Sequence, residues 1–369
     1  MNAEPPERTE PDPAPSPRTD DVVIAVDAMG GDRGVGAVIG GLAQAVAANP
    51  RLRFIVHGDE AELEDAIRTQ RNLAPHVEVR HAEDVITMSD RPSKALRTAQ
   101  GSSMWNALES VRTGESEVVI SCGNTGALMA LAMLRLRKAP EVDRPAIAIL
   151  WPSRNPTGYN VMLDAGADVR ADARDLLNYA LMGASYARHA LGLSRPRVGL
   201  LNVGTEEHKG RSELHEASEL IAAAAPRGDF EYLGYVEGSD IPSSRVDVIV
   251  TDGFTGNVAL KTGEGTASLI SARLREAFAY STFSRIGALF AAPALRRLKE
   301  RIDPRRVNGG VFLGLNGTVI KSHGGADATG YAAAVRLGCT LAENGFTRRL
   351  AARIASGGGS AAAMEAPTE

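Results

Sequence analysis

One short pattern recurs along this chain: a buried strand, a turn rich in glycine and small polar residues, and then a helix. Its fullest example begins at Asp247, where the β-branched run Val248–Val250 leads through such a turn into a helix that starts near Val258. Val118–Ile120 is followed in the same way by a Gly-Asn-Thr turn and a helix from Ala127. Apolar strands that alternate with helices are typical of parallel sheets covered by helices. The sequence therefore predicts an α/β fold with a doubly wound sheet.

The turns that follow these strands hold the candidate site residues. In a doubly wound sheet the carboxyl ends of the strands meet at one edge, where backbone amides and helix N-termini bind anions. We therefore expect a phosphate-bearing substrate there. The candidate substrate-binding residues are Asp27, Gly30, Gly31, Asn124, Thr125, Gly126, Asn202, Gly204, His208, Asp252, Gly253, Thr255 and Gly256. The candidate catalytic residues are Lys209, Lys321, His323 and Asn257.

Two nucleotide-binding alternatives fit the sequence less well. Lys261 follows the turn at 253–256, but no glycine precedes this lysine as a P-loop requires. Gly34, Gly36 and Gly40 form GxGxxxG instead of the dinucleotide fingerprint GxGxxG. Two aspartates between the first strand and these glycines would also repel a pyrophosphate. We therefore expect neither P-loop hydrolysis nor nicotinamide binding.

Composition and the missing motifs narrow the function further. The net charge of −4 argues against bulk nucleic-acid binding. Cys122 and Cys339 have no metal-ligand spacing and form no disulfide framework, and no HExxH, EF-hand or CxxC motif occurs, so we expect no metal and no cofactor. The first residues lack the apolar core of a signal peptide, and no apolar run could span a bilayer. These features favour a cytoplasmic protein.

The segment 266–305 differs in character from its surroundings, because aromatic and aliphatic residues alternate with arginines. A basic amphipathic helix of this kind can lie on an anionic membrane surface or bind an acidic partner. The same pattern fits a helix pair packed on the core or in a dimer interface, and both interpretations stay open. The candidate membrane or carrier contacts are Phe283, Ile286, Phe290, Arg296 and Arg297.

The chain divides into one domain with two tails. We expect an α/β domain over residues 21–350 that includes the amphipathic segment. The Pro-rich residues 1–20 predict a disordered tail, and the Ala/Gly-rich residues 351–369 predict a flexible one.

Six long motifs, in the right order from about Val22 to Gly345, resemble the bacterial acyl carrier protein:phosphate acyltransferases of phospholipid synthesis. They are DAMGGD at 27–32, SCGNTGALMA at 121–130, VGLLNVGTEEHKG at 198–210, VEGSDI at 236–241, DVIVTDGFTGNVALKT at 247–262 and GLNGTVIKSHG at 314–324. The resemblance implies a transferase that converts an acyl carrier protein thioester and inorganic phosphate into acyl phosphate and free carrier protein. It also implies a Rossmann-like α/β/α fold related to isocitrate dehydrogenase and phosphotransacetylase, a homodimer, and peripheral association with the membrane. A membrane glycerol-phosphate acyltransferase would then consume the acyl phosphate.

The chain departs from the family pattern at three places. Cys122 stands where the family commonly has alanine, which disfavours a cysteine nucleophile. Residues 98–100 are Thr-Ala-Gln where lysines are usual, and Asp168 replaces the asparagine of a GAN sequence. These departures change the charge near the expected substrate but leave the general reaction as implied.

The residues suggest a mechanism for this reaction. Phosphate is already an anionic nucleophile near neutral pH, so the enzyme has mainly to position it and to stabilise the tetrahedral oxyanion. We expect Lys209, Lys321 and the glycine-turn amides to hold phosphate, with Asn124 and Asn257 as hydrogen-bond donors. His323 or His208 would protonate the leaving sulfur. Two other functions remain open: a phosphotransacetylase-like enzyme that uses acyl-coenzyme A, and a non-catalytic scaffold that binds phosphate or acyl chains at the membrane.

Overall fold

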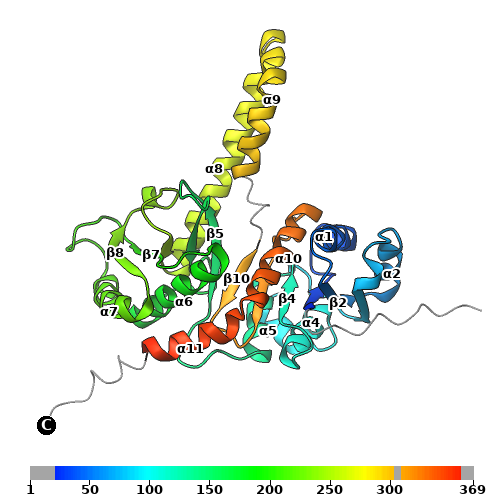
Figure 1. The fold of residues 1–369 in the computed structure, drawn as a ribbon, viewed down its shortest axis with the longest axis horizontal. Helices are drawn as coiled ribbons and strands as arrows, with labels where there is room; N and C mark the ends of the chain where they lie inside the picture. Colours follow the sequence, from blue (N-terminus) through cyan, green and yellow to red (C-terminus); the bar gives the residue numbers. More distant parts are fainter. Residues whose placement is uncertain (1–20, 303–308, 359–369) are drawn as a thin grey trace, which may run out of the picture.

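The computed structural model describes residues 21–302 and 309–358 (Figure 1). The predicted Pro-rich tail over 1–20 lies outside these residues. The described strands form one eleven-stranded sheet in the order β3-β2-β1-β4-β11-β10-β5-β6-β9-β7-β8. The strands are β1 (Val22–Asp27), β2 (Leu52–Gly58), β3 (Val77–His81), β4 (Val118–Ser121), β5 (Ala146–Pro152), β6 (Tyr159–Leu163), β7 (Arg197–Leu201), β8 (Glu231–Val236), β9 (Val248–Val250), β10 (Gly310–Leu313) and β11 (Thr318–Lys321).

The sheet is mostly parallel, which confirms the predicted α/β fold class, but its centre is antiparallel. β10 is antiparallel to both β11 and β5, and β5 is antiparallel to β6. Three successive reversals set β6, β7, β8 and β9 opposite in direction to β1, β2, β3, β4 and β11. The sequence did not predict this, because the stretch at 309–321 was interpreted as one strand. Gly314, with φ of +86°, instead turns the chain back into a β10–β11 hairpin.

Helices cover both faces of the sheet. They are α1 (Gly34–Ala48), α2 (Glu60–Arg68), α3 (Pro92–Thr98), α4 (Ser103–Arg112), α5 (Thr125–Arg135), α6 (Ala173–Leu191), α7 (Ser212–Gly228), α8 (Gly253–Ala279), α9 (Thr282–Ile302), α10 (Ala328–Glu343) and α11 (Phe346–Gly358). Strand β1 shows why both faces need to be covered, because its alternate side chains point to opposite faces of the sheet. Ile24 and Val26 belong to the core under α1 and α10, whereas Ala25 belongs to the core under α4 and α5.

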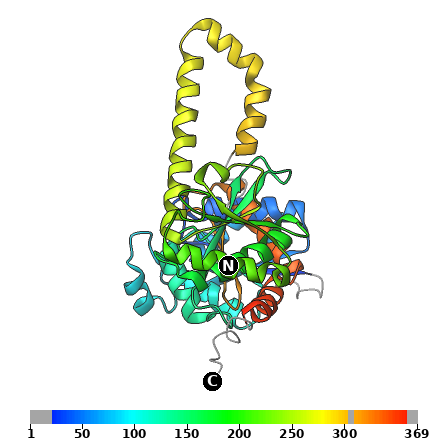
Figure 2. The same ribbon diagram turned by 90° about the vertical axis from the view of Figure 1, so that its left-hand side faces the viewer.

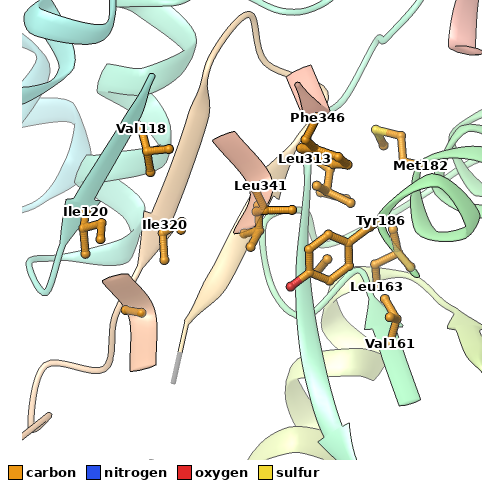
Figure 3. Packing of buried hydrophobic residues seen from close by; sticks show 14 of the residues in the cluster. Val118, Ile120, Val161, Leu163, Met182, Tyr186, Leu313, Ile320, Leu341 and Phe346 are labelled. Carbon is orange, nitrogen blue, oxygen red and sulfur yellow. The ribbon is translucent and has the colours of Figure 1, made fainter. Parts of the chain in front are cut away.

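One hydrophobic core joins the two halves of the sheet. Figure 3 shows Ile120 and Ile320 on one side of Leu341, a residue of α10, and Val161, Leu163 and Tyr186 on the other. Helix α6 lies at the centre of this core, and most of its side chains are buried. The residues before and after the antiparallel centre therefore fold as one unit.

The C-terminal residues depart from the predicted tail. Residues 351–358 belong to α11, where Leu350 and Ile354 are buried against the core and the helix packs on α6. The apolar spacing of this helix was obscured in the sequence by the neighbouring Ala/Gly-rich stretch. Residues 359–369 lie outside the described residues.

Helices α8 and α9 form a hairpin that projects from the body of the molecule (Figures 1 and 2). α8 has 27 residues and is about 40 Å long. The predicted amphipathic segment is therefore helical as far as Ile302, but it continues a helix that begins at Gly253 beside the sheet. Residues 303–305 lie outside the described part of the chain. No helix among the described residues is both long and apolar enough to cross a membrane.

Candidate functional site

Three turns that follow neighbouring parallel strands come together at one edge of the sheet. They follow β1, β4 and β11. A Cβ atom at Gly30 would lie 2.7 Å from Cα of Gly123, so the first two turns touch through their backbones. The backbone N–H of Asp32 donates a hydrogen bond of 2.9 Å to the carbonyl of Gly324, which joins the first turn to the third. The glycines predicted after β1 therefore permit this close approach.

Asp27 lies beneath these turns instead of facing a ligand. Its side chain is 1% exposed and accepts hydrogen bonds from the hydroxyls of Ser121 at 2.6 Å and Ser103 at 2.7 Å. Burial raises the pKa of the Asp27 carboxyl above its ordinary value, while both serine hydrogen bonds and the charge of Lys321 oppose that shift. Asp27, at the end of β1, therefore joins this strand to the end of β4 and to the start of α4.

Lys321 is the last residue of β11 and the best-placed cation of this edge. Its Nζ donates to the backbone carbonyls of Cys122, at 3.1 Å, and Ser322. Burial lowers the pKa of Lys321, whereas the carboxylates of Asp27 and Asp32 favour its charged form. Within residues 21–302 and 309–358 no carboxylate forms an ion pair with it. A largely buried ammonium without a paired carboxylate gains most from an anionic ligand.

His323 extends the same turn and is exposed. The N–H of Gly325 donates to Nδ1 of His323 at 3.1 Å. Because Nδ1 accepts this bond, the proton of the neutral ring sits on Nε2. That N–H makes His323 a candidate hydrogen-bond donor at the edge of the site.

Asn124 and Thr125, which the sequence predicted to bind the substrate, have different roles in the structure. Asn124 caps α5, since its Oδ1 accepts from the N–H of Ala127 at 3.0 Å. Its Nδ2 donates to the carbonyls of Met88 and Asp90, both at 2.9 Å. Both amide hydrogens of Asn124, which the sequence predicted to donate to the substrate, are used for these carbonyls in the structure. Thr125, at the first position of α5, lines the cavity described below.

The turn that precedes α8 is also held by its own contacts. Asp252 caps α8 by accepting from the N–H of Thr255 at 2.8 Å, and it accepts from Arg211 at 2.7 Å. Burial alone would raise the pKa of Asp252, but the bonds from Thr255 and Arg211 outweigh it and hold this pKa below its ordinary value. A Cβ at Gly253 or Gly256 would lie 2.1 and 1.9 Å from backbone oxygens of the loop after β6. Asp252, Gly253, Thr255 and Gly256, predicted to bind phosphate, instead build the start of the helix.

Helix α8 carries the next residues toward Lys321. It runs from Asn257, beside Gly166 in the loop after β6, to Gly263, which lies against Trp151 of β5. Asn257 is exposed, and its side chain donates to no group in the described part of the chain. Lys261 lies one turn further along the helix and forms a 2.9 Å ion pair with Glu264.

These elements enclose a cavity of about 600 Å³. Its polar lining comes from the turns and from α8, and its apolar lining comes from β5, α8 and the loop after β6. Of the predicted residues, Thr125, Asn257, Lys321 and His323 line it, together with backbone at Gly324 and Gly325. Residues Asp32, Lys261 and Glu264 also line it.

The turn after β7 stands apart from this cavity. Asn202 donates to the carbonyl of Lys209 at 2.8 Å, and Nζ of Lys209 pairs with Glu206 at 2.7 Å. A Cβ at Gly204 would lie 2.5 Å from the Lys209 side chain. His208 is exposed in the same turn. Lys209, His208, Asn202 and Gly204 do not line the cavity.

Asp32 and Lys261 are the site residues that sequence reasoning missed. Both occur in quoted motifs, and Lys261 was considered only as a P-loop lysine. The signal that could have identified Lys261 is its spacing of four from Asn257, which places both on one helical face. Asp168, a departure from the family pattern, pairs with Arg144 instead of facing the cavity.

The remaining chemistry of this edge is limited. Cys122 is 3% exposed, and burial raises the pKa of its thiol to about 11, so it stays protonated at neutral pH. Nowhere in the described ranges do three His, Cys, Asp or Glu side chains gather closely enough to hold a metal ion. The arrangement of glycine turns, helix N-terminus and buried lysine suits the binding of an anion.

Comparison with known proteins gives a consistent result. The chain matches the family described as "Fatty acid synthesis protein" over residues 22–349. The phosphate acyltransferase of Jannaschia sp. (strain CCS1) is 66% identical over 335 residues, which cover 91% of this chain and 92% of the relative. The phosphate acyltransferase of Paracoccus denitrificans (strain Pd 1222) is 66% identical over 336 residues, which cover 91% of each.

Solved structures share the fold at low sequence identity. A phosphotransacetylase from Streptococcus pyogenes aligns with a TM-score of 0.58 at 15% identity, over 88% of this chain and 95% of that one. The EutD phosphotransacetylase from Staphylococcus aureus aligns with a TM-score of 0.57 at 15% identity, over 87% and 94%. The predicted likeness to the phosphotransacetylase fold is thereby confirmed.

Proposed function

Because this chain belongs to the phosphate acyltransferase family, we propose that it transfers a fatty acyl group from acyl carrier protein to inorganic phosphate in the cavity beside Lys321. Family membership makes it an acyltransferase of fatty acid and phospholipid synthesis. The identity of the acyl donor, the location of the active site and the chemical steps are what we propose. The observation that carries it is a buried lysine without a paired carboxylate at the junction of three glycine turns, next to an apolar wall.

The reaction joins a phosphate oxygen to the carbonyl carbon of the thioester and breaks its carbon–sulfur bond. Lys321 holds the phosphate by charge, and the N–H groups of Gly324 and of the first turn of α5 add hydrogen-bond donors. Asn257, across the cavity on α8, donates to the oxyanion that develops on the carbonyl. Phosphate attacks directly, and no acyl-enzyme forms.

The leaving sulfur departs as a thiolate and takes up a proton. Of the two histidines considered, His323 lines the cavity and His208 does not. His323 is therefore the proposed hydrogen-bond donor to the departing thiolate, through Nε2, which carries the ring proton when Nδ1 accepts from Gly325; the thiolate then takes its proton from solvent.

The acyl donor is tested by comparing two thioesters of the same chain, palmitoyl-acyl carrier protein and palmitoyl-coenzyme A. Thiol release is measured with and without phosphate. Phosphate-dependent release at higher kcat/KM from the carrier protein supports the proposal. A preference for coenzyme A would favour the phosphotransacetylase-like alternative, which the shared fold suggests. No turnover with either donor would favour the scaffold.

We further propose that the α8–α9 hairpin places the enzyme on the cytoplasmic membrane surface, where a membrane acyltransferase could receive the acyl phosphate. The hairpin projects from the body, so it is not a helix pair packed on the core (Figure 2). Phe283 and Phe290 are 88% and 85% exposed, and Arg296 and Arg297 on the same helix are also exposed. An aromatic surface beside arginines suits an anionic bilayer.

Phe283→Glu should lower binding to vesicles containing anionic lipid by about tenfold or more, because it replaces an apolar contact with a charge. Vesicle co-sedimentation measures this loss. Val169→Glu, at a valine that is 71% exposed on the body, is the matched control. Unchanged vesicle binding together with a halved molecular mass in solution would instead assign the hairpin to a homodimer interface.

A further inference from the structure

The cavity beside Lys321 has two chemically different ends. The polar end is formed by the turns after β1, β4 and β11. The other end is lined by Ile147, Ile149 and Leu150 of β5, by Ala165, and by Leu260 of α8. None of these side chains carries a hydrogen-bonding group. A ligand that fills both ends must therefore be anionic or polar at one end and hydrocarbon at the other.

The apolar side chains continue beyond the cavity in one direction. Ile147, Ile149 and Trp151 occupy alternate positions of β5 and therefore share one face of the strand. Helix α8 meets this row closely at Gly263, where a Cβ would lie 2.6 Å from the indole ring of Trp151. The part of the cavity lined by Ile147, Ile149 and Leu260 is called the β5 groove below. Its far end is the contact between Trp151 and Gly263.

Glycine keeps the near end of the β5 groove open. Gly310 of β10 pairs with Lys321 across the sheet and lines the cavity. A Cβ at Gly310 would lie 2.8 Å from Cγ2 of Ile147 and would fill the space beside that side chain. The groove therefore begins next to the lysine that holds the proposed phosphate.

We propose that the β5 groove holds the fatty acyl chain of the donor, with the carbonyl carbon near Lys321 and the chain end toward Trp151. This inference rests on the proposed function. The pantetheine arm of the donor fits the groove poorly, because its amides would have no partners among Ile, Leu and Trp side chains. Each methylene buried in such a groove tightens binding about fourfold. Leu260 and Trp151 then determine which chain lengths are preferred.

The experiment measures kcat/KM for octanoyl- and palmitoyl-acyl carrier protein, and the readout is the palmitoyl-to-octanoyl ratio. Leu260→Trp adds bulk to the wall of the groove and should lower this ratio about tenfold or more, equivalent to about two methylenes. Leu269→Trp, on the same helix beyond the cavity and 57% exposed, is the matched control. The ratio cancels any effect of the control on carrier docking.

Trp151→Ala provides a second variant that removes bulk instead of adding it. It should move the preferred chain length upward in a series from octanoyl to stearoyl donors. A ratio within twofold of wild type for Leu260→Trp, or an unchanged optimum for Trp151→Ala, overturns the proposal. If wild-type protein shows no phosphate-dependent thiol release from any donor, the proposed function fails instead, so the two failures are distinguishable.

Discussion

Replacing Lys321 by methionine removes the proposed phosphate-binding charge while keeping an unbranched side chain of similar length. Lys321 is largely buried, forms no ion pair with a described carboxylate, and donates only to backbone carbonyls. A hydrogen bond to a charged group contributes about 1.5–3 kcal/mol. Lys321→Met should therefore lower kcat/KM for phosphate by about 10- to 150-fold.

The fold should tolerate this change. The loss of bonds to the carbonyls of Cys122 and Ser322 is offset by removal of a desolvated charge, so the stability change should stay within about 1–2 kcal/mol. Initial rates at varied phosphate and fixed acyl carrier protein thioester measure the effect, and urea unfolding checks the fold. Lys138→Met, at a lysine that bonds the carbonyl of Asp143 outside the cavity, is the control. A folded Lys321→Met enzyme with kcat/KM for phosphate within twofold of wild type would refute the assignment of the site.

Three further predictions test the framework around the site. Gly256→Ala should lower the free energy of unfolding by about 1–3 kcal/mol, because the added Cβ would meet the carbonyl of Asp164. Gly265→Ala in the same helix meets nothing and should raise the free energy of unfolding by about 0.5–1 kcal/mol. Urea unfolding that ranks the two variants the other way would contradict the packing. Asp252→Ala should cost about 0.5–2 kcal/mol from the lost cap of α8, and an unchanged urea midpoint would count against that role. Burial raises the pKa of Asp27 in the folded state, so the folded protein binds this proton more tightly than the unfolded chain does. Wild-type stability should therefore fall as pH rises from about 3.8 through the folded-state pKa. The difference in unfolding free energy between wild type and Asp27→Asn should change over the same pH range, and a pH-independent difference would contradict this role.

The sequence predicted the turns at one edge of the sheet well. Strand, glycine turn and helix is a local pattern, and it correctly marked Thr125, Lys321 and His323 as neighbours of one cavity. It also located the start of α8, whose Asn257 reaches the same cavity. The family resemblance supplied the reaction class, which the comparisons confirm.

The local pattern could not predict the directions of the strands relative to one another. Lys209 follows a strand and glycine turn just as Lys321 does, but the reversals at β10 and β5 set β7 antiparallel to β11. Carboxyl ends in the two groups therefore lie at opposite edges of the sheet. Asn257 still lines the same cavity as Lys321, because it lies on α8 beside Gly166 in the loop after β6.

Local sequence also does not separate a helix cap from a ligand donor. Asn124 and Asp252 both precede a helix, where a short polar side chain can bond either the first free amides or a substrate. Their full set of partners, which includes the distant residues Met88 and Arg211, is visible only in the folded chain. The apolar β5 groove could not be predicted either, because its residues have the sequence pattern of an ordinary buried strand.

The central claim is that phosphate itself takes the acyl group at this site. Its most direct test is thiol release from palmitoyl-acyl carrier protein by wild-type enzyme, with and without inorganic phosphate, with the product trapped by hydroxylamine. The account predicts release only when phosphate is present, with acyl hydroxamate formed in equal amount. A burst of thiol equal to the enzyme concentration without phosphate would indicate an acyl-enzyme and contradict direct attack. No release in the presence of phosphate would contradict the acyl-transfer assignment itself.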